Sequence, residues 1–190
     1  MTEPVGGADS STAALAAAVV AGLRDRSQTL ATAESLTGGL VGATLTGIPG
    51  ASVVYRGGLI TYATELKAGL ARVSALTLAA HGPVAPSTAA ELARGAADVC
   101  GADWGLATTG VAGPEPQDGH PVGQVFVAIA PPASSGGRDD HRSVEVRELA
   151  LTGDRSMIRD QTTRAVLQLL LETLRAARPD GCSTPPGVET

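Results

Sequence analysis

The sequence predicts a single-domain α/β protein of three layers, in which helices cover both faces of a mixed β-sheet. Segments with helical spacing of apolar residues alternate with short apolar segments, typical of buried strands, in the first part of the chain. The strand segments that follow are neighbours in the sequence, which favours a mixed sheet over a purely parallel one. A chain of 190 residues fits one domain. We expect that domain at 11–177, between flexible termini at 1–10 and 178–190 that are rich in Pro, Gly, Ser and Thr.

The first elements alternate between helix and strand. Apolar residues recur at helical spacing over 13–23, which predicts a helix. The segment 29–35 is short, apolar and polar at its end, so it predicts a buried strand, and 37–47 then turns into a helix. The segment 51–62 is expected to form two strands, with a break at Gly57 and Gly58.

The remaining elements have recognisable start signals. A helix is expected from Thr64, and Thr88 with Glu91 forms a candidate capping box for the next helix. Asp154 is a candidate N-cap for a long last helix, whose apolar residues continue to Leu174. The segments between these helices are expected to be core strands at 104–110 and 123–130, a surface hairpin loop at 131–140 and a half-exposed strand at 143–149.

Composition and charge exclude several classes of partner. The formal net charge is −5 and aromatic residues make up only 2% of the chain, so neither a basic surface nor a set of stacking platforms is available for nucleic acid. An acidic chain is equally unsuited to an anionic membrane surface, and no apolar run reaches the length of a membrane helix. The three histidines lack metal-ligand spacing, so we expect no metal and no cofactor. A cytoplasmic protein is expected, because acidic residues precede the first apolar stretch and a secretory leader is basic there.

Lys67 is the only lysine in the chain, because the other 13 of its 14 cationic Lys and Arg side chains are arginine. Arginine stays protonated at physiological pH, whereas a desolvated lysine can lose its proton. Lys67 is therefore a candidate general base or Schiff-base amine. An exposed helix lysine with no special role is the alternative, and composition does not decide between the two.

Ser35 ends the strand expected at 29–35, within the stretch AESLTGG. Ligands of open α/β sheets bind at the carboxyl ends of strands. The N–H groups of Thr37, Gly38 and Gly39 are expected to hold an anion or a developing oxyanion. A serine N-cap followed by packing glycines is the structural alternative.

Two further stretches are candidates for binding a phosphate. In TTGVAGPEPQDGHPVGQV, a strand ends in hydroxyl residues before a long loop, so Thr109, Gly110 and Gly113 are candidate donors. A hairpin connection that needs turn residues explains this stretch equally well. Arg155 and Arg159 share one face of the last helix, and a common anionic partner would relieve their repulsion. A solvated helix face is the alternative.

Several stretches together resemble the C-terminal domain family of the CinA proteins, which are nicotinamide-nucleotide amidohydrolases, also called NMN deamidases. The similarity runs from about Leu15 to Leu174 and is carried by TAESLTGGLVGATLTGIPGAS, YRGGLITYATELKAGL, HGPV, TTGVAGP, GHPVGQV and GDRSMIRDQ. Some family members also carry an N-terminal domain that resembles molybdopterin-binding proteins. The chain has no room for it, so we expect the stand-alone form.

The resemblance implies that Ser35, Tyr62 and Lys67 are the catalytic residues, that nicotinamide mononucleotide (NMN) is the substrate, and that the protein is a homo-oligomer, in particular a dimer. Leu36 and Ala85 depart from the cysteine and serine that are common at these positions. The expected reaction is hydrolysis of the nicotinamide carboxamide, in which Lys67 takes the proton of Ser35 directly or through Tyr62. Two alternatives stay open: a nucleotide-binding module of this fold without turnover, and a Ser–Lys amidase for another small amide.

Overall fold

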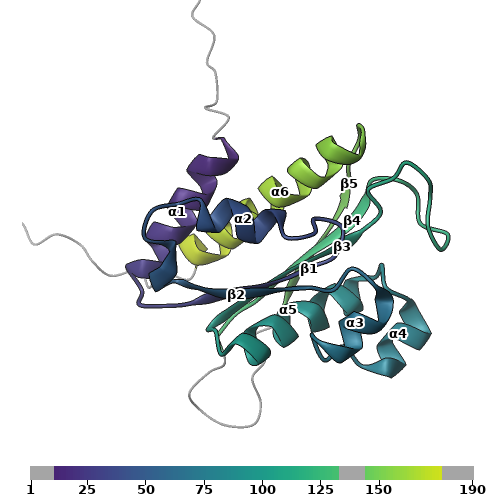
Figure 1. Cartoon of the computed structure of the whole chain (residues 1–190), viewed down its shortest axis with the longest axis horizontal. Coiled ribbons are helices and arrows are strands. Elements are labelled where there is room, and N and C mark those ends of the chain that lie inside the picture. The colour runs from purple at the N-terminus through teal and green to yellow at the C-terminus, as the bar shows by residue number, and fades with distance from the viewer. Residues whose placement is uncertain (1–10, 133–143, 177–190) are drawn as a thin grey trace, which may run out of the picture.

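A five-stranded mixed sheet forms the middle layer of the fold, with the strand order β2-β1-β3-β4-β5 (Figure 1). The computed structural model describes residues 11–132 and 144–176. The strands are β1 (Leu30–Glu34), β2 (Tyr55–Ile60), β3 (Trp104–Gly110), β4 (Gln124–Ala130) and β5 (Glu145–Ala150). Strands β2, β1 and β3 are parallel to one another, whereas β3–β4 and β4–β5 are antiparallel pairs. The sheet is therefore mixed, as the sequence predicts.

Helices cover both faces of this sheet (Figure 1). The helices are α1 (Thr12–Arg24), α2 (Leu40–Thr46), α3 (Thr64–Gly69), α4 (Ala75–His81), α5 (Pro86–Cys100) and α6 (Arg155–Ala176), with a short 3₁₀ helix at Ala51–Val53. Helices α1, α2 and α6 lie on one face, and α3, α4 and α5 lie on the other (Figure 1). The predicted three-layer α/β/α fold class is confirmed.

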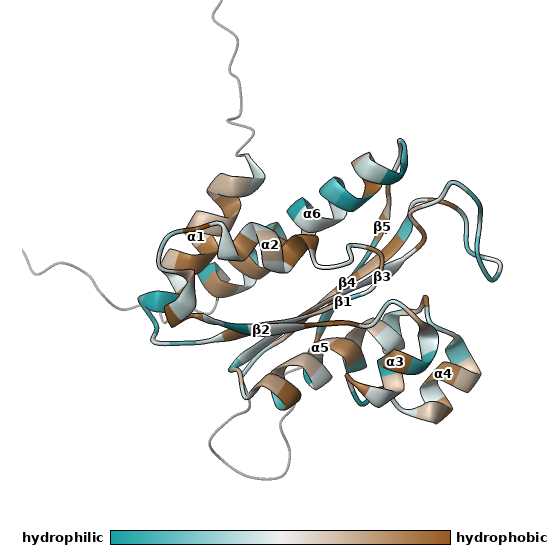
Figure 2. Ribbon diagram, in the orientation of Figure 1, coloured by the Kyte–Doolittle hydropathy of each residue, from teal (hydrophilic) through white to brown (hydrophobic). Residues whose placement is uncertain are grey.

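Each face of the sheet has its own hydrophobic core. Successive side chains of a strand point to opposite faces, so Leu106 of β3 joins the cluster beneath α1 and α6, whereas Ala107 joins the cluster beneath α5. Both sides of β1 are covered, and all five of its residues are buried. The sheet is largely apolar in Figure 2, and the loop between β3 and β4 is hydrophilic at its tip. A Cβ at Gly105 would overlap the carbonyl oxygen of Ala93, so a glycine is needed where α5 approaches β3.

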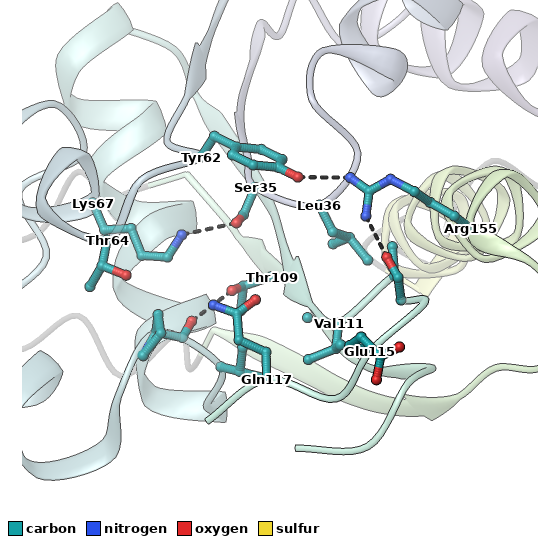
Figure 3. Close-up of a pocket in the computed structure, with 15 residues that line it drawn as sticks. Ser35, Leu36, Tyr62, Thr64, Lys67, Thr109, Val111, Glu115, Gln117 and Arg155 are labelled. Atoms are coloured by element: carbon teal, nitrogen blue, oxygen red, sulfur yellow. Dashed lines mark hydrogen bonds between the residues drawn. The ribbon is translucent and has the colours of Figure 1, made fainter. Parts of the chain in front are cut away.

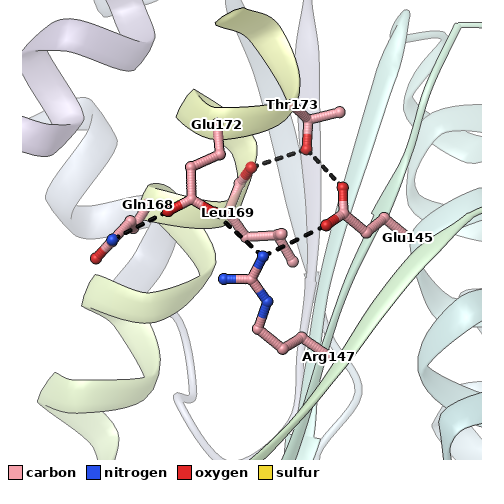
Figure 4. A network of polar contacts seen from close by, with 6 residues as sticks. All are labelled: Glu145, Arg147, Gln168, Leu169, Glu172 and Thr173. Carbon is pink, nitrogen blue, oxygen red and sulfur yellow. Dashed lines mark hydrogen bonds and ion pairs between the residues drawn. The ribbon is translucent and has the colours of Figure 1, made fainter. Parts of the chain in front are cut away.

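Polar contacts join the outer strand β5 to α6 (Figure 4). Arg147 of β5 lies 3.4 Å from Glu145 and 3.1 Å from Glu172 of α6, and the Thr173 hydroxyl donates to Glu145. These side chains are about half exposed, so each ion pair contributes at most about 1 kcal/mol. Four of the six residues of β5 are exposed and two are intermediate, so this strand is more exposed than the half-exposed strand that its alternating sequence predicts.

Most predicted elements of the described chain are confirmed. Helix α1, strands β1, β3, β4 and β5, helix α3 and the long α6 lie within a few residues of their expected bounds. Asp154 Oδ1 accepts a hydrogen bond from the N–H of Met157, as expected of the N-cap. The loop expected at 131–140 lies almost wholly outside the described residues, and so do the termini expected to be flexible. No helix in the described ranges is long and apolar enough to cross a membrane.

Two local predictions are wrong. The expected break at Gly57 and Gly58 is absent, because a single strand β2 runs through both glycines after the 3₁₀ helix. A Cβ at Gly58 would collide with Thr32 Oγ1 and the Tyr55 hydroxyl, so this glycine makes room for neighbouring side chains and does not interrupt the strand.

The capping box of Thr88 and Glu91 is also absent. Helix α5 begins earlier, at Pro86, with Ala85 as its N-cap. Thr88 Oγ1 donates to the carbonyl oxygen of Gly82 at 2.7 Å, and the Glu91 carboxylate accepts hydrogen bonds from residues that precede and begin α4. The two side chains therefore hold the α4–α5 connection together and do not cap a helix.

Candidate active site

The carboxyl ends of three parallel strands meet at one edge of the sheet and form the base of a pocket (Figure 3). Ser35 follows β1, and its N–H donates to the carbonyl oxygen of Thr108 on β3 at 3.0 Å. Thr61 follows β2, and its N–H donates to the carbonyl oxygen of Glu34 at 2.8 Å. Sheet hydrogen bonding thus continues past the strand ends and fixes the backbone on both sides of Ser35. Ligands of α/β sheets bind at such an edge.

Lys67 reaches this edge from α3 and contacts Ser35 directly. Its Nζ lies 3.0 Å from Ser35 Oγ and 2.7 Å from the carbonyl oxygen of Thr61. The side chain is only 1% exposed, so the exposed-lysine alternative is excluded. A carbonyl oxygen can only accept, so one N–H of the amine points to Thr61. The other side of Nζ faces Ser35.

Burial changes the protonation of this amine. Desolvation lowers the pKa of Lys67 from 10.5 to about 8. No carboxylate within the described ranges forms an ion pair with Lys67 that would hold the proton in place. Roughly a tenth of Lys67 is therefore neutral at pH 7. Serine and neutral lysine in hydrogen-bond contact have the geometry of a nucleophile and its general base.

Tyr62 lies at the pocket but bonds elsewhere (Figure 3). Its hydroxyl accepts a hydrogen bond from Arg155 Nη2 at 2.7 Å, and Arg155 Nη1 donates to the carbonyl oxygen of Gly113 at 2.8 Å. Arg155 therefore connects the segment after β2 with the loop after β3. Because Lys67 and Ser35 are in direct contact, a proton needs no relay through Tyr62 to pass between them.

Of the three N–H groups expected to serve a ligand, that of Thr37 has no acceptor among the described residues, whereas the expectation is wrong for Gly38 and Gly39. The N–H of Gly38 donates to the carbonyl oxygen of Ser35, and the N–H of Gly39 donates to a carboxylate oxygen of Glu34 at 2.9 Å. The same carboxylate also accepts from Val41 and from a third N–H of the first turn of α2. Glu34 is buried, so the anion site at this helix start is filled by the protein itself.

Thr37 and Arg159 also lie away from the pocket. Thr37 is fully buried, and its hydroxyl bonds to that of Thr108 at 2.8 Å. Arg159 donates to the carbonyl oxygens of Leu36 and Thr37, at 3.1 and 2.7 Å. Arg155 and Arg159 therefore do not share one anion: Arg155 lines the pocket, whereas Arg159 fastens the turn after Ser35 to α6.

The loop after β3 supplies the opposite wall of the pocket. Thr109 and Gly110 at the end of β3 and Gly113 in the loop line this wall, and their binding of a ligand stays a prediction. The Thr109 hydroxyl donates its hydrogen to the carbonyl oxygen of Pro83 at 2.6 Å, so it has no second hydrogen to donate to a ligand. Gly110 and Gly113 have φ values of 157° and 82°, which favour glycine. A Cβ at these positions would also collide with Val125 and Val122, respectively.

Sequence reasoning missed several residues of the site. Leu36, Thr64, Val84, Glu115 and Gln117 also line the pocket. Glu115 and Gln117 belong to the glycine- and proline-rich loop, in which only the hydroxyl and glycine donors were predicted from the sequence. The N–H of Leu36 has no acceptor among the described residues and lies directly after Ser35. The residue after a nucleophilic serine is a recurrent oxyanion donor, so the sequence already points to this N–H group.

A serine with a buried lysine, at the carboxyl ends of parallel strands, defines a Ser–Lys site on an α/β sheet. Comparison with known proteins gives the family. The CinA C-terminal domain family model matches residues 12–174, and the chain belongs to this family. A CinA-like protein of Frankia casuarinae is 44% identical over 169 residues, which cover 89% of this chain and 36% of that protein. A putative competence-damage inducible protein of a Geobacillus species is 43% identical over 155 residues, which cover 82% of this chain and 35% of that protein.

Solved structures share the fold over nearly their whole length. A CinA superfamily protein from Enterobacter cloacae superimposes with a TM-score of 0.83 at 27% identity, covering 92% of this chain and 98% of that one. A CinA superfamily protein from Klebsiella pneumoniae gives a TM-score of 0.78 at 32% identity, covering 87% and 98%. The chain thus matches these solved proteins almost completely, whereas it spans about a third of the length of the two relatives above.

Proposed function

We propose that this protein hydrolyses the carboxamide of NMN to nicotinate mononucleotide and ammonia. The observation that carries the proposal is the buried Lys67 amine, 3.0 Å from the Ser35 hydroxyl, in a pocket that also contains an arginine. The Lys67 amine and the Ser35 hydroxyl suit acyl transfer from an amide, and the arginine suits an anionic substituent of the substrate. Membership of the CinA C-terminal domain family supports the choice of NMN among amides.

Acylation begins with proton transfer. Neutral Lys67 accepts the proton of Ser35 Oγ as that oxygen attacks the carboxamide carbon. The carbonyl oxygen of the substrate becomes an oxyanion, and the N–H of Leu36 is the donor that we assign to it, because no described residue accepts from this group. One such donor is typically worth about 3–4 kcal/mol in the transition state. The C–N bond then breaks as protonated Lys67 returns its proton to the departing nitrogen, which leaves as ammonia.

Deacylation reuses the same groups. The ester between Ser35 and the nicotinoyl group is attacked by water, whose proton passes to Lys67. Collapse of the second tetrahedral intermediate breaks the ester bond, and the proton on Lys67 returns to Ser35 Oγ. The products are the free serine and the nicotinic acid group, which ionises to the carboxylate and releases its proton to solvent. These proposed steps use neither a metal nor a cofactor.

Arg155 is the residue that we assign to the substrate phosphate. A guanidinium has five N–H donors, and Arg155 uses two of them on Tyr62 and Gly113, so three remain for an anion. The Tyr62 hydroxyl accepts from Arg155 and keeps its own hydrogen to donate. We therefore assign Tyr62 to substrate positioning beside Arg155, and proton transfer to Lys67 alone.

A homodimer belongs to the same proposal, as does a cytoplasmic location. Strand β2 is an edge of the sheet. Ile60 of β2, Leu66 of α3 and Leu70 directly after α3 are exposed apolar residues. A second copy of the chain would cover this edge and its apolar side chains. Light scattering should give twice the mass of the chain at working concentration, and a monomer mass would exclude the dimer.

An ammonia-release assay with NMN, nicotinamide and glutamine tests the proposed activity. We expect NMN to have the highest kcat/KM, because it alone offers both the aromatic carboxamide and a phosphate. Preference for glutamine would instead identify an amidase of another kind. Calorimetric binding of NMN without ammonia release would identify a nucleotide-binding module.

A further inference from the structure

Glu115 is the one carboxylate that lines the pocket within the described chain. It is exposed to solvent, and none of the residues that the structure describes forms a hydrogen bond or ion pair with it. Figure 3 shows Glu115 on the side of the pocket where Arg155 lies, away from Lys67. The catalytic steps proposed above do not use this side chain.

The loop that carries Glu115 is held in place at both ends and near its tip. Val111 donates to the carbonyl oxygen of Gln124 at 2.9 Å, and Gly123 donates back to that of Val111 at 2.8 Å. Gln117 and His120 exchange backbone hydrogen bonds of 3.1 and 2.8 Å. Two residues before Glu115, the carbonyl oxygen of Gly113 accepts from Arg155. The protein therefore presents the carboxylate from an ordered backbone.

A carboxylate is an unexpected group beside a phosphate site. The charged residues that line the pocket are Lys67, Glu115 and Arg155, and Arg155 is the one assigned to the phosphate. A negative side chain near that position repels a phosphate, so Glu115 weakens binding unless another part of the ligand compensates. That part must donate hydrogen bonds or carry positive charge, because an ionised carboxylate is an acceptor only.

We infer that Glu115 binds the ribose hydroxyls of the substrate and selects ribonucleotides over pyridines that lack the sugar diol. The inference rests on the function proposed above. With the carboxamide at Ser35 and the phosphate at Arg155, the ribose lies between them. A vicinal diol offers two O–H donors, which match the two oxygens of one carboxylate, and an acidic side chain binds ribose in this way in dinucleotide sites.

The cationic pyridinium ring of NMN is the competing target. Glu115 is exposed, so solvent weakens both its repulsion of the phosphate and its attraction to the ring charge, whereas hydrogen bonds to a diol depend on contact. The ring also has to lie beside Ser35 for its carboxamide to react, and Glu115 lies on the Arg155 side (Figure 3). Both considerations favour the diol.

Binding to the Ser35→Ala protein tests this inference without turnover. Calorimetry compares NMN with its 2′-deoxyribose analogue and with reduced NMN, which keeps the ribose but has an uncharged ring. With Glu115 intact, we expect NMN to bind about tenfold or more tightly than the deoxy analogue. Adding Glu115→Ala should abolish this preference and weaken NMN and reduced NMN by the same factor. Glu65→Ala is the matched control, because Glu65 is also exposed but lies outside the pocket, on α3 beside Lys67.

Three results would overturn the inference. An unchanged preference for NMN over the deoxy analogue in Glu115→Ala would show that Glu115 is a solvated side chain that does not bind the ribose. Weaker binding of NMN alone, with reduced NMN unaffected, would assign Glu115 to the cationic ring. If none of the three ligands bound, the pocket would not be a nucleotide site. A protein that binds NMN with the expected preference but releases no ammonia, before Ser35 is replaced, would refute the proposed function and leave the role of Glu115 standing.

Discussion

Lys67 Nζ lies 3.0 Å from Ser35 Oγ, although the two residues are 32 positions apart in the sequence. Helix α3 supplies the amine, and the turn after β1 supplies the hydroxyl. The contact exists because β1 and β2 are parallel neighbours, so that the segments leaving their carboxyl ends lie on the same edge of the sheet. A lysine buried at this edge has a lowered pKa and a single reactive partner.

The first prediction concerns the pH dependence of catalysis. Lys67 must be neutral to take the proton of Ser35, and burial lowers its pKa to about 8. We therefore expect kcat/KM for NMN to rise about tenfold per pH unit below pH 8 and to level off above it. Initial rates between about pH 6 and pH 9 measure the profile. A flat profile over this range would exclude Lys67 as a base with this pKa.

The second prediction concerns stability. The unfolded chain keeps the pKa of Lys67 near 10.5, whereas the folded chain lowers it to about 8, so the unfolded state binds more protons between these two values. The free energy of unfolding should therefore rise with pH across this window, by about 3 kcal/mol from this group. Below about pH 8 the full cost of burying the charged amine is present.

Lys67→Met isolates this effect. Methionine fills a similar space without a titratable group, so the variant should lack the rise of about 3 kcal/mol between about pH 8 and pH 10.5. Urea unfolding of both proteins at several pH values gives the difference, in which the titration of all other groups cancels. Parallel pH curves for the two proteins would show that Lys67 has an ordinary pKa in the folded state.

The third prediction separates two neighbouring arginines of α6. Arg155 lines the pocket, so Arg155→Ala should raise the KM for NMN about tenfold or more. It should raise the KM for nicotinamide riboside, which lacks the phosphate, much less, because there only the contacts of Arg155 with Tyr62 and Gly113 are lost. Arg159 instead donates to the carbonyl oxygens of Leu36 and Thr37. Arg159→Ala should therefore lower the free energy of unfolding by about 1–3 kcal/mol.

Each of these arginine variants is the control for the other. Steady-state kinetics with both substrates and urea unfolding of both variants give the comparison. Equal losses of Arg155→Ala with the nucleotide and the riboside would show that the phosphate is held elsewhere. An Arg159→Ala protein of full stability would show that its two hydrogen bonds contribute nothing net.

The fourth prediction follows from the N-cap of α5. Ala85 occupies this position and provides no side-chain hydrogen bond to the first turn. Ala85→Ser should raise the free energy of unfolding by about 1 kcal/mol, because its hydroxyl can accept from a free N–H of that turn. Ala85→Gly is the control without a hydroxyl. A serine variant no more stable than the glycine variant would contradict the capping role.

The site was predictable from the sequence where its chemistry depends on residue type. The single lysine and a serine at a strand end identify Lys67 and Ser35, and helical spacing gives α1 and α6. Long-range contacts were not predictable. The Glu34 carboxylate reaches forward to the start of α2 and fills the anion site expected at Gly39. Similarly, Gly58 reads locally as a strand break, and only its approach to Thr32 explains it.

Ammonia release from NMN by the purified protein and by its Ser35→Ala variant is the most direct test of the central claim. We expect steady ammonia production by the parental protein, and a loss of nearly all of it in the variant, which keeps the fold but lacks the attacking oxygen. Release by the variant at the parental rate would contradict the assignment of Ser35 as the nucleophile.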